Sequence, residues 1–367
     1  MQTAGARVSH MRFDGSQLER RHELAGCLTS ALHTEADHAA GAVGHILLRD
    51  RIVGAGGKSG VVDPGNLGVV LQKLCYGLRV FAVTGHAYMQ AFQTQVEQES
   101  ALRGGGGAKV AHANGVPLII DNTFATPVNC RPFEWGADIV THSTTKYMDG
   151  HGVQVGGAIV DSGNFDWMAH AEKFPGLCTP DDSYHGITYA EKFGKEGAFI
   201  TKCTAQLMRD FGCTPSPQSA FYLNLGLESL HVRMARHCEN GQAVAEFLAA
   251  QPQVECVHYC GLESDPYHAV AQKYLPNGSC GVVSFELKGG RPAVEAFMKA
   301  LKLAAIETHV ADARTCCLNP ATSTHRQMNE EQLKAAGVPV GLVRISCGLE
   351  HKDDLIADIK QALEAMN

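Results

Sequence analysis

Residues 116–161 carry the clearest pattern in the chain and read VPLIIDNTFATPVNCRPFEWGADIVTHSTTKYMDGHGVQVGGAIVD. Three short apolar runs lie within this segment, at Val116–Ile120, Ala137–Val140 and Val153–Val160. Each run has the length of a buried strand and is bounded by Gly, Pro, Asn or Asp, which favour turns. The pattern therefore predicts three strands of an α/β protein.

An acid and an amine lie just past the carboxyl ends of two of these runs. Asp121 comes immediately after the first run, and Lys146 follows the second after the residues His142-Ser143-Thr144-Thr145. Open α/β sheets bind their ligands beyond the carboxyl ends of the strands. We therefore expect Asp121 and Lys146 to face one site at the edge of the sheet.

This pair suits an enzyme that uses pyridoxal phosphate (PLP). Such an enzyme needs a lysine to hold the aldehyde as a Schiff base and a carboxylate to keep the pyridine nitrogen protonated. Ser143 and Thr145 are placed to supply hydroxyls for the phosphate. The spacing alone leaves another interpretation open, in which Asp121 is a turn acid and Lys146 is a solvated lysine.

The motifs DNTFATP at 121–127 and HSTTKYMDGHG at 142–152 resemble those of the Cys/Met-metabolism PLP-dependent enzymes of fold type I. The similarity extends from about Val110 to the C-terminus and favours the O-acetylhomoserine sulfhydrylase branch. It implies that Lys146 is the Schiff-base lysine and that Asp121 is the pyridinium partner. It also implies that Ser143 and Thr145 bind the phosphate of PLP.

The same resemblance implies an α/β fold of two domains. A large domain with a mostly parallel sheet would be followed by a smaller C-terminal α/β domain. The expected regions are a divergent N-terminal region at 1–109, a PLP-binding core at 110–235 and the small domain at 236–367.

Within this layout, residues 215–251 read as a long helical pair, because Ser216-Pro217 fits a helix cap followed by Pro at the first helical position. Val283, Phe285 and Leu287 alternate with polar residues, which predicts a half-buried strand. Asp353 is the predicted cap of a final helix.

Arg344 lies inside another predicted strand, at 341–347. A buried charge needs a partner of opposite sign, because an unpaired one is strongly destabilising. The partner is either a carboxylate of the protein or a substrate α-carboxylate held by the guanidinium fork. The resemblance of LVRISCGLEH at 342–351 to the end of the family's sequences favours the substrate. By resemblance, Thr315 lies near the same carboxylate.

The N-terminal third departs from the family pattern. It lacks the family's Tyr-x-Arg element, and Thr84-Gly85-His86 is only a partial match to the Ser-Gly-Met-like phosphate turn. Tyr76-Gly77 is the one match to the segment that stacks on the pyridine, and it precedes Gly85, which reverses the family's order. Glu99-Ser100 begins an E-S-x-x-N-P-like element that lacks the asparagine. We therefore expect parts of the family's pocket to be deleted or replaced here.

A nucleotide-binding alternative rests on Gly57-Lys58-Ser59, which match the end of a P-loop. Ile52 occupies the position of that loop's first glycine, so the P-loop pattern fails. A dinucleotide fingerprint fails as well, because Gly54-Ala55-Gly56 is followed three residues later by Ser59 rather than Gly. A glycine-rich surface loop is the simpler interpretation.

Composition limits the partners. The net charge of −7 suggests no nucleic-acid partner, and no apolar run has the length of a membrane span. The N-terminal residues MQTAGARVSHMRF lack the apolar core of a secretory signal. The 13 cysteines form no C-x-x-C pair, which predicts reduced thiols and no metal site. A cytoplasmic location is the default expectation.

The residues and the resemblance together predict γ-replacement on O-acetyl-L-homoserine, with PLP as the cofactor. Sulfide or a small thiol would replace the acetate and give homocysteine or methionine. Only the branch resemblance separates this activity from that of a cystathionine γ-synthase or γ-lyase. The missing N-terminal elements favour a further alternative, a catalytically impaired or incomplete family member. By resemblance, the active unit is a homo-oligomer, a dimer or tetramer with shared sites.

Overall fold

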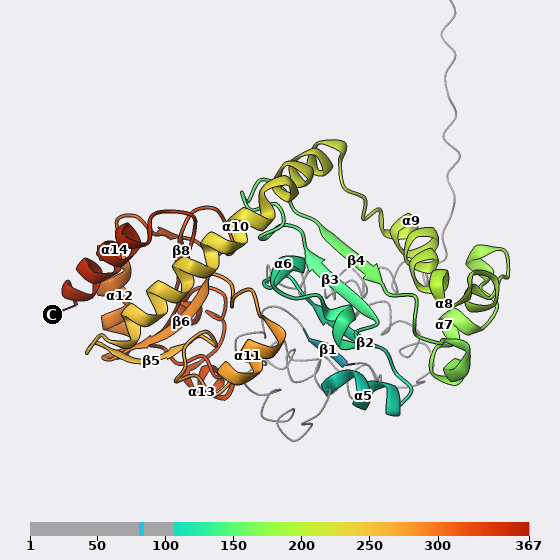
Figure 1. The fold of residues 1–367 in the computed structure, drawn as a ribbon, viewed down its shortest axis with the longest axis horizontal. Helices are drawn as coiled ribbons and strands as arrows, with labels where there is room; N and C mark the ends of the chain where they lie inside the picture. The colour runs from blue at the N-terminus through green and yellow to red at the C-terminus, as the bar shows by residue number, and fades with distance from the viewer. Residues whose placement is uncertain (1–80, 84–105, 367) are drawn as a thin grey trace, which may run out of the picture.

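The computed structural model describes residues 81–83 and 106–366. Two β-sheets lie side by side in this part, and the long helix α10 (Pro217–Ala249) runs from one to the other (Figure 1). The motifs discussed around Lys58, Tyr76, Gly85 and Glu99 lie outside the described residues, as does nearly all of the predicted region 1–109.

The first sheet has the order β1 (Phe81–Val83), β2 (Leu118–Asp121), β3 (Ile139–Ser143) and β4 (Gly157–Asp161). Strands β1, β2 and β3 are parallel, whereas β4 is antiparallel to β3. The three strands predicted within 116–161 are therefore confirmed, each beginning a few residues later than expected. Because β2 and β3 are parallel neighbours, their carboxyl ends meet at the same edge of the sheet.

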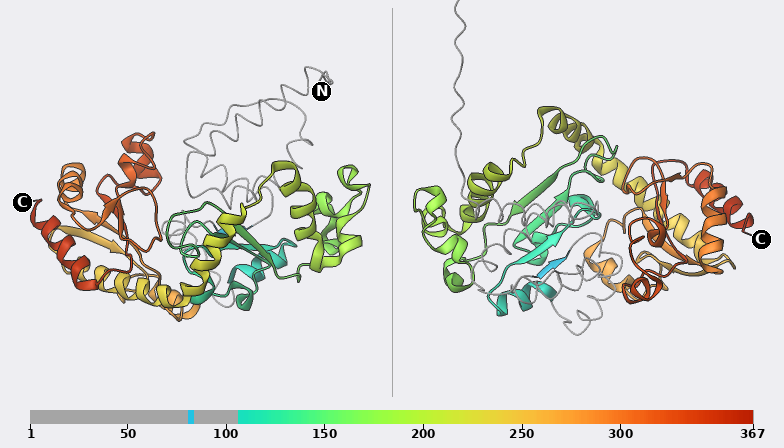
Figure 2. Two further views of the ribbon diagram at one scale, coloured as in Figure 1. Left: turned by 90° about the horizontal axis from the view of Figure 1, so that it is seen from above. Right: turned by 180° about the vertical axis from the view of Figure 1, so that it is seen from behind.

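Short helices connect and cover this sheet. They are α5 (Gly106–Ala113), α6 (Thr126–Asn129), α7 (Pro175–Cys178), α8 (Tyr189–Lys202) and α9 (Arg209–Phe211), together with 3-10 helices at Pro132–Trp135, Met168–Lys173 and Asp182–Tyr184. A π-helical segment, Cys203–Met208, joins α8 to α9. Helices α7 to α9 lie at the end of the molecule opposite the C-terminus (Figure 2). Trp167, Phe174 and Phe199 pack there with Ile139 and Val140 in one apolar core.

The second sheet has the order β5-β6-β9-β8-β7. Its strands are β5 (Val254–His258), β6 (Val282–Leu287), β7 (Ala305–Ile306), β8 (Cys316–Leu318) and β9 (Leu342–Ser346). All neighbours are antiparallel except the parallel pair β7 and β8. The remaining helices are α11 (His268–Tyr274), α12 (Gly290–Ala300), α13 (Glu330–Ala335), α14 (Lys352–Glu364) and a 3-10 turn at Pro320–Thr322.

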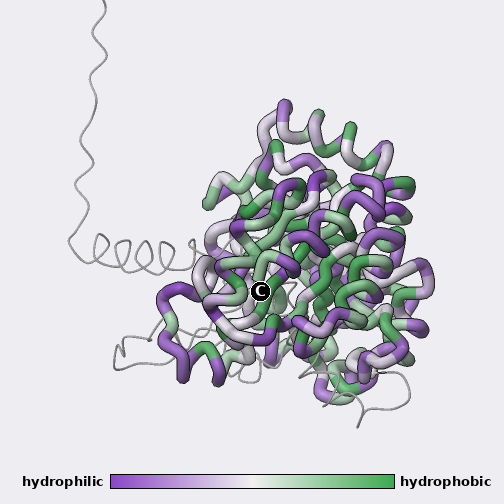
Figure 3. The backbone as a smooth tube through the Cα atoms, turned by 90° about the vertical axis from the view of Figure 1, so that its left-hand side faces the viewer, coloured by the Kyte–Doolittle hydropathy of each residue, from purple (hydrophilic) through white to green (hydrophobic). Residues whose placement is uncertain are grey.

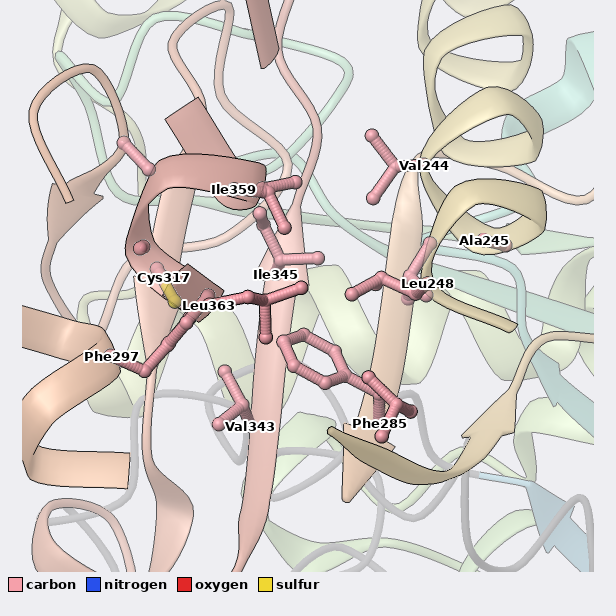
Figure 4. Close-up of a cluster of buried hydrophobic side chains, with 14 of the residues drawn as sticks. Val244, Ala245, Leu248, Phe285, Phe297, Cys317, Val343, Ile345, Ile359 and Leu363 are labelled. Carbon is pink, nitrogen blue, oxygen red and sulfur yellow. The ribbon is translucent and has the colours of Figure 1, made fainter. Parts of the chain in front are cut away.

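Helices α10, α12 and α14 share one core with this sheet. Leu248, Phe297 and Ile359 from the helices pack with Phe285 and Ile345 from the strands (Figure 4). The helices at this end alternate hydrophilic and hydrophobic residues along their turns, as amphipathic helices do (Figure 3).

A third apolar cluster, the junction cluster, lies where the two parts of the molecule meet. Its buried members are Phe124, Tyr147, Leu230, Met234, Cys280, Val282, Val310 and Ala311. Strand β6 contributes to both cores, Phe285 to one and Val282 to the other, so both of its faces are covered. The prediction of a half-buried strand here was therefore wrong about burial, although the strand itself is confirmed.

Helix α10 is one continuous helix rather than the predicted helical pair. Ser216 caps it as predicted, since its Oγ accepts a hydrogen bond of 3.0 Å from the Ser219 amide. The predicted domain boundary between residues 235 and 236 falls inside this helix. The final helix begins differently from the prediction, because His351 is the N-cap and Asp353 lies in the first turn.

A buried carboxylate ties α14 to the segment before β7. Asp358 accepts hydrogen bonds from the amides of Lys302, Leu303 and Ala304, at 2.8, 2.9 and 3.0 Å. Successive amides that point to one anion form a nest. No helix in the described part of the chain has the length and apolar character needed to cross a bilayer.

Candidate active site

Asp121 ends strand β2 and is only 5% exposed. Its Oδ1 accepts hydrogen bonds from the Thr123 amide at 3.0 Å and from the Thr123 hydroxyl at 2.5 Å. The turn contact that the simpler interpretation expected is therefore present. It fixes the orientation of a carboxylate that is buried at the carboxyl end of a parallel strand, where ligands bind.

Thr123 joins the ends of β2 and β3. Its hydroxyl donates to Asp121 and accepts a hydrogen bond of 2.8 Å from the Ser143 amide. The strand register pairs Asp121 with Thr141, so the next residue on the same face of β3 is Ser143. Sequence reasoning gave Thr123 no role, and the only signal for one was its position two residues after the acid.

Lys146 lies in the turn that follows β3 and is also only 5% exposed. Its amide donates to the Ser143 carbonyl at 3.3 Å, and its carbonyl accepts from the Gly150 amide at 2.8 Å. A solvated lysine would be exposed, so the structure excludes that interpretation. Hydrogen bonds through Thr123 and Ser143 thus connect the acid to the turn that carries the amine.

The two predicted phosphate ligands differ in their surroundings. Ser143 ends β3 and is partly exposed. The Thr145 hydroxyl accepts a hydrogen bond of 3.0 Å from the Gly156 amide. It also donates to the Gly156 carbonyl over 3.4 Å. A donor contact of 3.4 Å is long, so this hydroxyl proton is able to turn to a stronger acceptor such as a phosphate.

His142 precedes this group and is 3% exposed. Burial lowers the pKa of its imidazole from 6.5 to about 4, against a smaller opposite effect of the Asn122 backbone. The ring is therefore neutral at pH 7, and its buried Nδ1 has no hydrogen-bond partner. These properties describe a core histidine.

Arg344 lies on β9 of the second sheet and is partly buried. Its Nη2 donates to the Thr308 carbonyl at 3.0 Å. Five residues further along the same loop, the Ala313 amide donates to the Gly150 carbonyl at 2.8 Å, in the turn that carries Lys146. One loop, 308–313, therefore contacts both the predicted carboxylate anchor and the lysine turn.

Thr315 does not lie beside Arg344. The register of β8 and β9 pairs Leu318 with Arg344, which puts Thr315 about 10 Å further along the strand. Its hydroxyl donates to Glu350 Oε2 and accepts from the Gly348 amide, both at 2.8 Å. These bonds occupy the hydroxyl, so the structure adds no support to its predicted substrate role, which stays a prediction.

A family model described as Cys/Met metabolism PLP-dependent enzyme matches residues 106–364. The chain belongs to this family. The match covers the second sheet and all strands of the first sheet except β1, and it includes Asp121, Lys146 and Arg344. It confirms the resemblance inferred from the motifs.

Individual relatives agree with this assignment. The chain is 47% identical over 258 residues to a homocysteine synthase of Schizosaccharomyces pombe, covering 70% of this chain and 60% of the relative. It is 42% identical over 265 residues to an O-acetyl-L-homoserine sulfhydrylase of Leptospira meyeri, with coverages of 70% and 60%. The chain thus spans about 60% of the length of these curated relatives.

A solved structure is similar as well. A crystal structure assigned as an O-acetylhomoserine (thiol)-lyase of Campylobacter jejuni superimposes with a TM-score of 0.65 at 34% identity. The match covers 70% of this chain and 61% of that one. That protein carries a pyridoxyl group on a lysine. The fold class, α/β with a PLP fold type I neighbour, is therefore confirmed.

The residues present fit PLP, the cofactor of the family. A buried carboxylate ends β2, and a buried amine follows the parallel neighbour β3. Thr123 hydrogen-bonds both to this carboxylate and to the Ser143 amide at the end of β3. Lys146 would hold the aldehyde, and Asp121 would face the ring nitrogen. In the described residues, no group of three or more His, Cys, Asp or Glu side chains is arranged to hold a metal ion.

Proposed function

We propose that this protein replaces the acetate of O-acetyl-L-homoserine with sulfide or a small thiol, giving homocysteine or methionine. The main support for this proposal is the buried pair Asp121 and Lys146 at the carboxyl ends of β2 and β3, connected through Thr123. The relatives described as homocysteine synthase and O-acetylhomoserine sulfhydrylase support the choice of substrate.

The chemistry divides among three side chains. PLP, when bound, would draw electrons from the substrate Cα and so make its protons acidic. Asp121 would keep the ring nitrogen of PLP protonated. Lys146 would hold the aldehyde of PLP, and its Nζ, when free, would serve as the base that moves protons at Cα and Cβ of the substrate. Acetate then leaves from Cγ and sulfide forms the new C–S bond there. Arg344 binds the α-carboxylate.

The first experiment tests the cofactor site. Purified protein is loaded with PLP, reduced with borohydride and digested, and mass spectrometry locates the pyridoxyl adduct. We expect the adduct on Lys146 in the native chain and none at that position in Lys146→Ala. If PLP dialyses away without leaving an adduct on Lys146, the proposed function fails.

The acceptor distinguishes the related activities. With O-acetylhomoserine and sulfide we expect homocysteine and one equivalent of acetate. Formation of cystathionine when cysteine replaces sulfide would favour a γ-synthase, and release of a keto acid without an acceptor would favour a γ-lyase. An adduct without turnover would favour the impaired member suggested by the N-terminal third.

We also propose that the active form is a homo-oligomer, a dimer or tetramer, and that it works in the cytoplasm. The first proposal follows from the family resemblance, and the second follows from the cysteine pattern, which predicts reduced thiols. Light scattering of the purified protein measures its mass, and a monomer with full activity would contradict the first proposal.

A further inference from the structure

Arg233 is a buried cation on helix α10, with 6% of its surface exposed. Its guanidinium donates to the carbonyls of Tyr147 at 2.8 Å, Met148 at 3.3 Å and Gly226 at 2.7 Å. Its Nε donates to the Ser229 hydroxyl at 3.0 Å. These acceptors are uncharged oxygens, and two of them belong to the two residues that follow Lys146.

The guanidinium lies directly against the lysine turn. Gly150 closes this turn with φ of +74°, and a Cβ at that position would collide with Arg233 Nη1. On the same side, a Cβ at Gly226 would lie 2.5 Å from the Met148 carbonyl oxygen. The turn and the helix are therefore in backbone contact, and Arg233 fills the remaining space between them.

The same face of α10 also holds the end of β9. His237 Nδ1 lies 2.7 Å from the Cys347 carbonyl, and Asn240 Nδ2 donates to the carbonyls of Gly348 and Glu350, both at 2.9 Å. Arg233, His237 and Asn240 are spaced four and three residues apart, so they lie on one helix face. Strand β9 carries Arg344.

One helix face therefore fixes both predicted anchors of the substrate. Residues 233 and 240 are separated by about 10 Å along a rigid helix. The substrate must reach Lys146 with its Cα while its carboxylate binds Arg344. A misplacement of about 1 Å is enough to lower the rate of such a reaction by about 100-fold.

We propose that Arg233 is a positioning residue, which holds the turn after β3, and with it Lys146, at a fixed distance from Arg344. The catalytic part of this inference rests on the proposed function. The structural part, that Arg233 orders the lysine turn, does not depend on any reaction.

Amide hydrogen exchange tests the structural part on the full chain without a substrate. We expect Arg233→Gln to accelerate exchange in residues 144–150, where the Lys146 amide bonds to the Ser143 carbonyl and the amides of Asp149 and Gly150 bond to the carbonyls of Thr144 and Lys146. Arg236→Gln is the matched control, because Arg236 lies on the same helix, is partly exposed and pairs only with Glu239 at 3.4 Å in the described residues. We expect it to leave exchange in 144–150 unchanged.

Steady-state kinetics test the catalytic part. We expect Arg233→Gln to lower kcat by about 10- to 100-fold with a much smaller change in KM, because the displaced lysine moves protons during the chemical steps. Arg233→Lys keeps the charge but not the fork of donors, so we expect partial recovery of kcat. The visible absorbance of the PLP–Lys146 adduct should shift in Arg233→Gln and not in Arg236→Gln.

Native-like exchange in 144–150 together with native kcat in Arg233→Gln would overturn the inference. If Arg233→Gln does not fold, Arg233→Lys is measured in the same two ways and decides. If the native chain forms no adduct on Lys146, the proposed function fails; the exchange result then still supports or overturns the ordering of the turn by Arg233.

Discussion

Thr123 is a single small side chain, but it connects two residues on which the proposed chemistry depends. Its hydroxyl donates to Asp121 and accepts from the Ser143 amide, so it uses both functions of the oxygen inside a buried site. Removing one partner of a buried hydrogen bond leaves the other unpaired, which costs about 1–3 kcal/mol.

We therefore expect Thr123→Val to lower the free energy of unfolding by about 1–3 kcal/mol and to weaken the binding of PLP. Thr123→Ser should restore most of both, because it returns the hydroxyl. Urea unfolding and absorbance titration with PLP measure the two effects. Thr179→Val, which removes an exposed hydroxyl bonded to the Pro175 carbonyl, is the control. Equal losses in the two valine variants would contradict the role of Thr123.

The buried imidazole of His142 makes stability depend on pH. Its pKa is about 4 in the folded chain, against an ordinary value of 6.5. Between these values the unfolded chain binds the additional proton, so stability falls as pH decreases from 6.5 to 4 and this contribution changes no further below that. The shift corresponds to up to about 3 kcal/mol.

We expect His142→Gln to reduce the loss of stability between pH 7 and pH 4.5. Urea unfolding at both pH values, in the native chain and the variant, gives the difference. An identical pH dependence in the two proteins would show that another group controls acid sensitivity.

At the scale of the element, helix α10 combines a close backbone contact with a row of polar side chains. Gly226 is the point of closest approach to the lysine turn, where a Cβ would meet the backbone of Met148 and Asp149. Backbone atoms cannot move aside as the end of a side chain can, so this site accepts no larger residue without displacing the turn.

We expect Gly226→Ala to destabilise the protein by about 1–3 kcal/mol through overpacking, even though alanine favours a helix. Gly197→Ala in α8 is the control, because its Cβ would make only a tight contact of 3.3 Å with the Phe193 side chain. Thermal unfolding followed by circular dichroism compares the two. A melting temperature of Gly226→Ala at or above that of the native chain would contradict the contact.

Local sequence patterns predicted strands β2, β3, β4, β6 and β9, the final helix α14 and a helical region at α10, but not β5, β7, β8 or the 3-10 helices of the described part. These elements are predictable because the apolar run and the turn residues that bound it lie next to one another in the sequence. Local patterns did not predict Arg233, whose carbonyl partners at Tyr147 and Met148 are 86 and 85 positions away. The local pattern also could not show that β6 is covered on both faces. Val282 packs in the junction cluster, whose other members come from distant parts of the sequence.

At the scale of the whole molecule, the two sheets meet at Tyr147, the residue after Lys146. It is fully buried, its ring lies 4.7 Å from that of His237, and its hydroxyl accepts a hydrogen bond of 3.1 Å from the Gly281 amide. The lysine turn is thus anchored in the junction cluster, and the relative position of the two parts is linked to the position of the amine.

We expect Tyr147→Phe to lower the free energy of unfolding by about 1–2 kcal/mol, because the buried Gly281 amide loses its acceptor. The apolar contacts of the ring would remain. Tyr222→Phe removes a hydroxyl that is bonded to Gln218 in an exposed position and serves as the control. Urea unfolding measures both, and a Tyr147→Phe variant as stable as the control would contradict the importance of this bond.

The amide nest at Lys302–Ala304 has a consequence for solution conditions. Such concave rows of N–H groups attract phosphate and sulfate in many proteins, but here the chain's own Asp358 carboxylate already fills the position. A buffer anion would therefore have to displace Asp358 to bind at these three amides. The negative charge at the amides of 302–304 belongs to Asp358, a residue of the same chain. It is therefore present at every ionic strength.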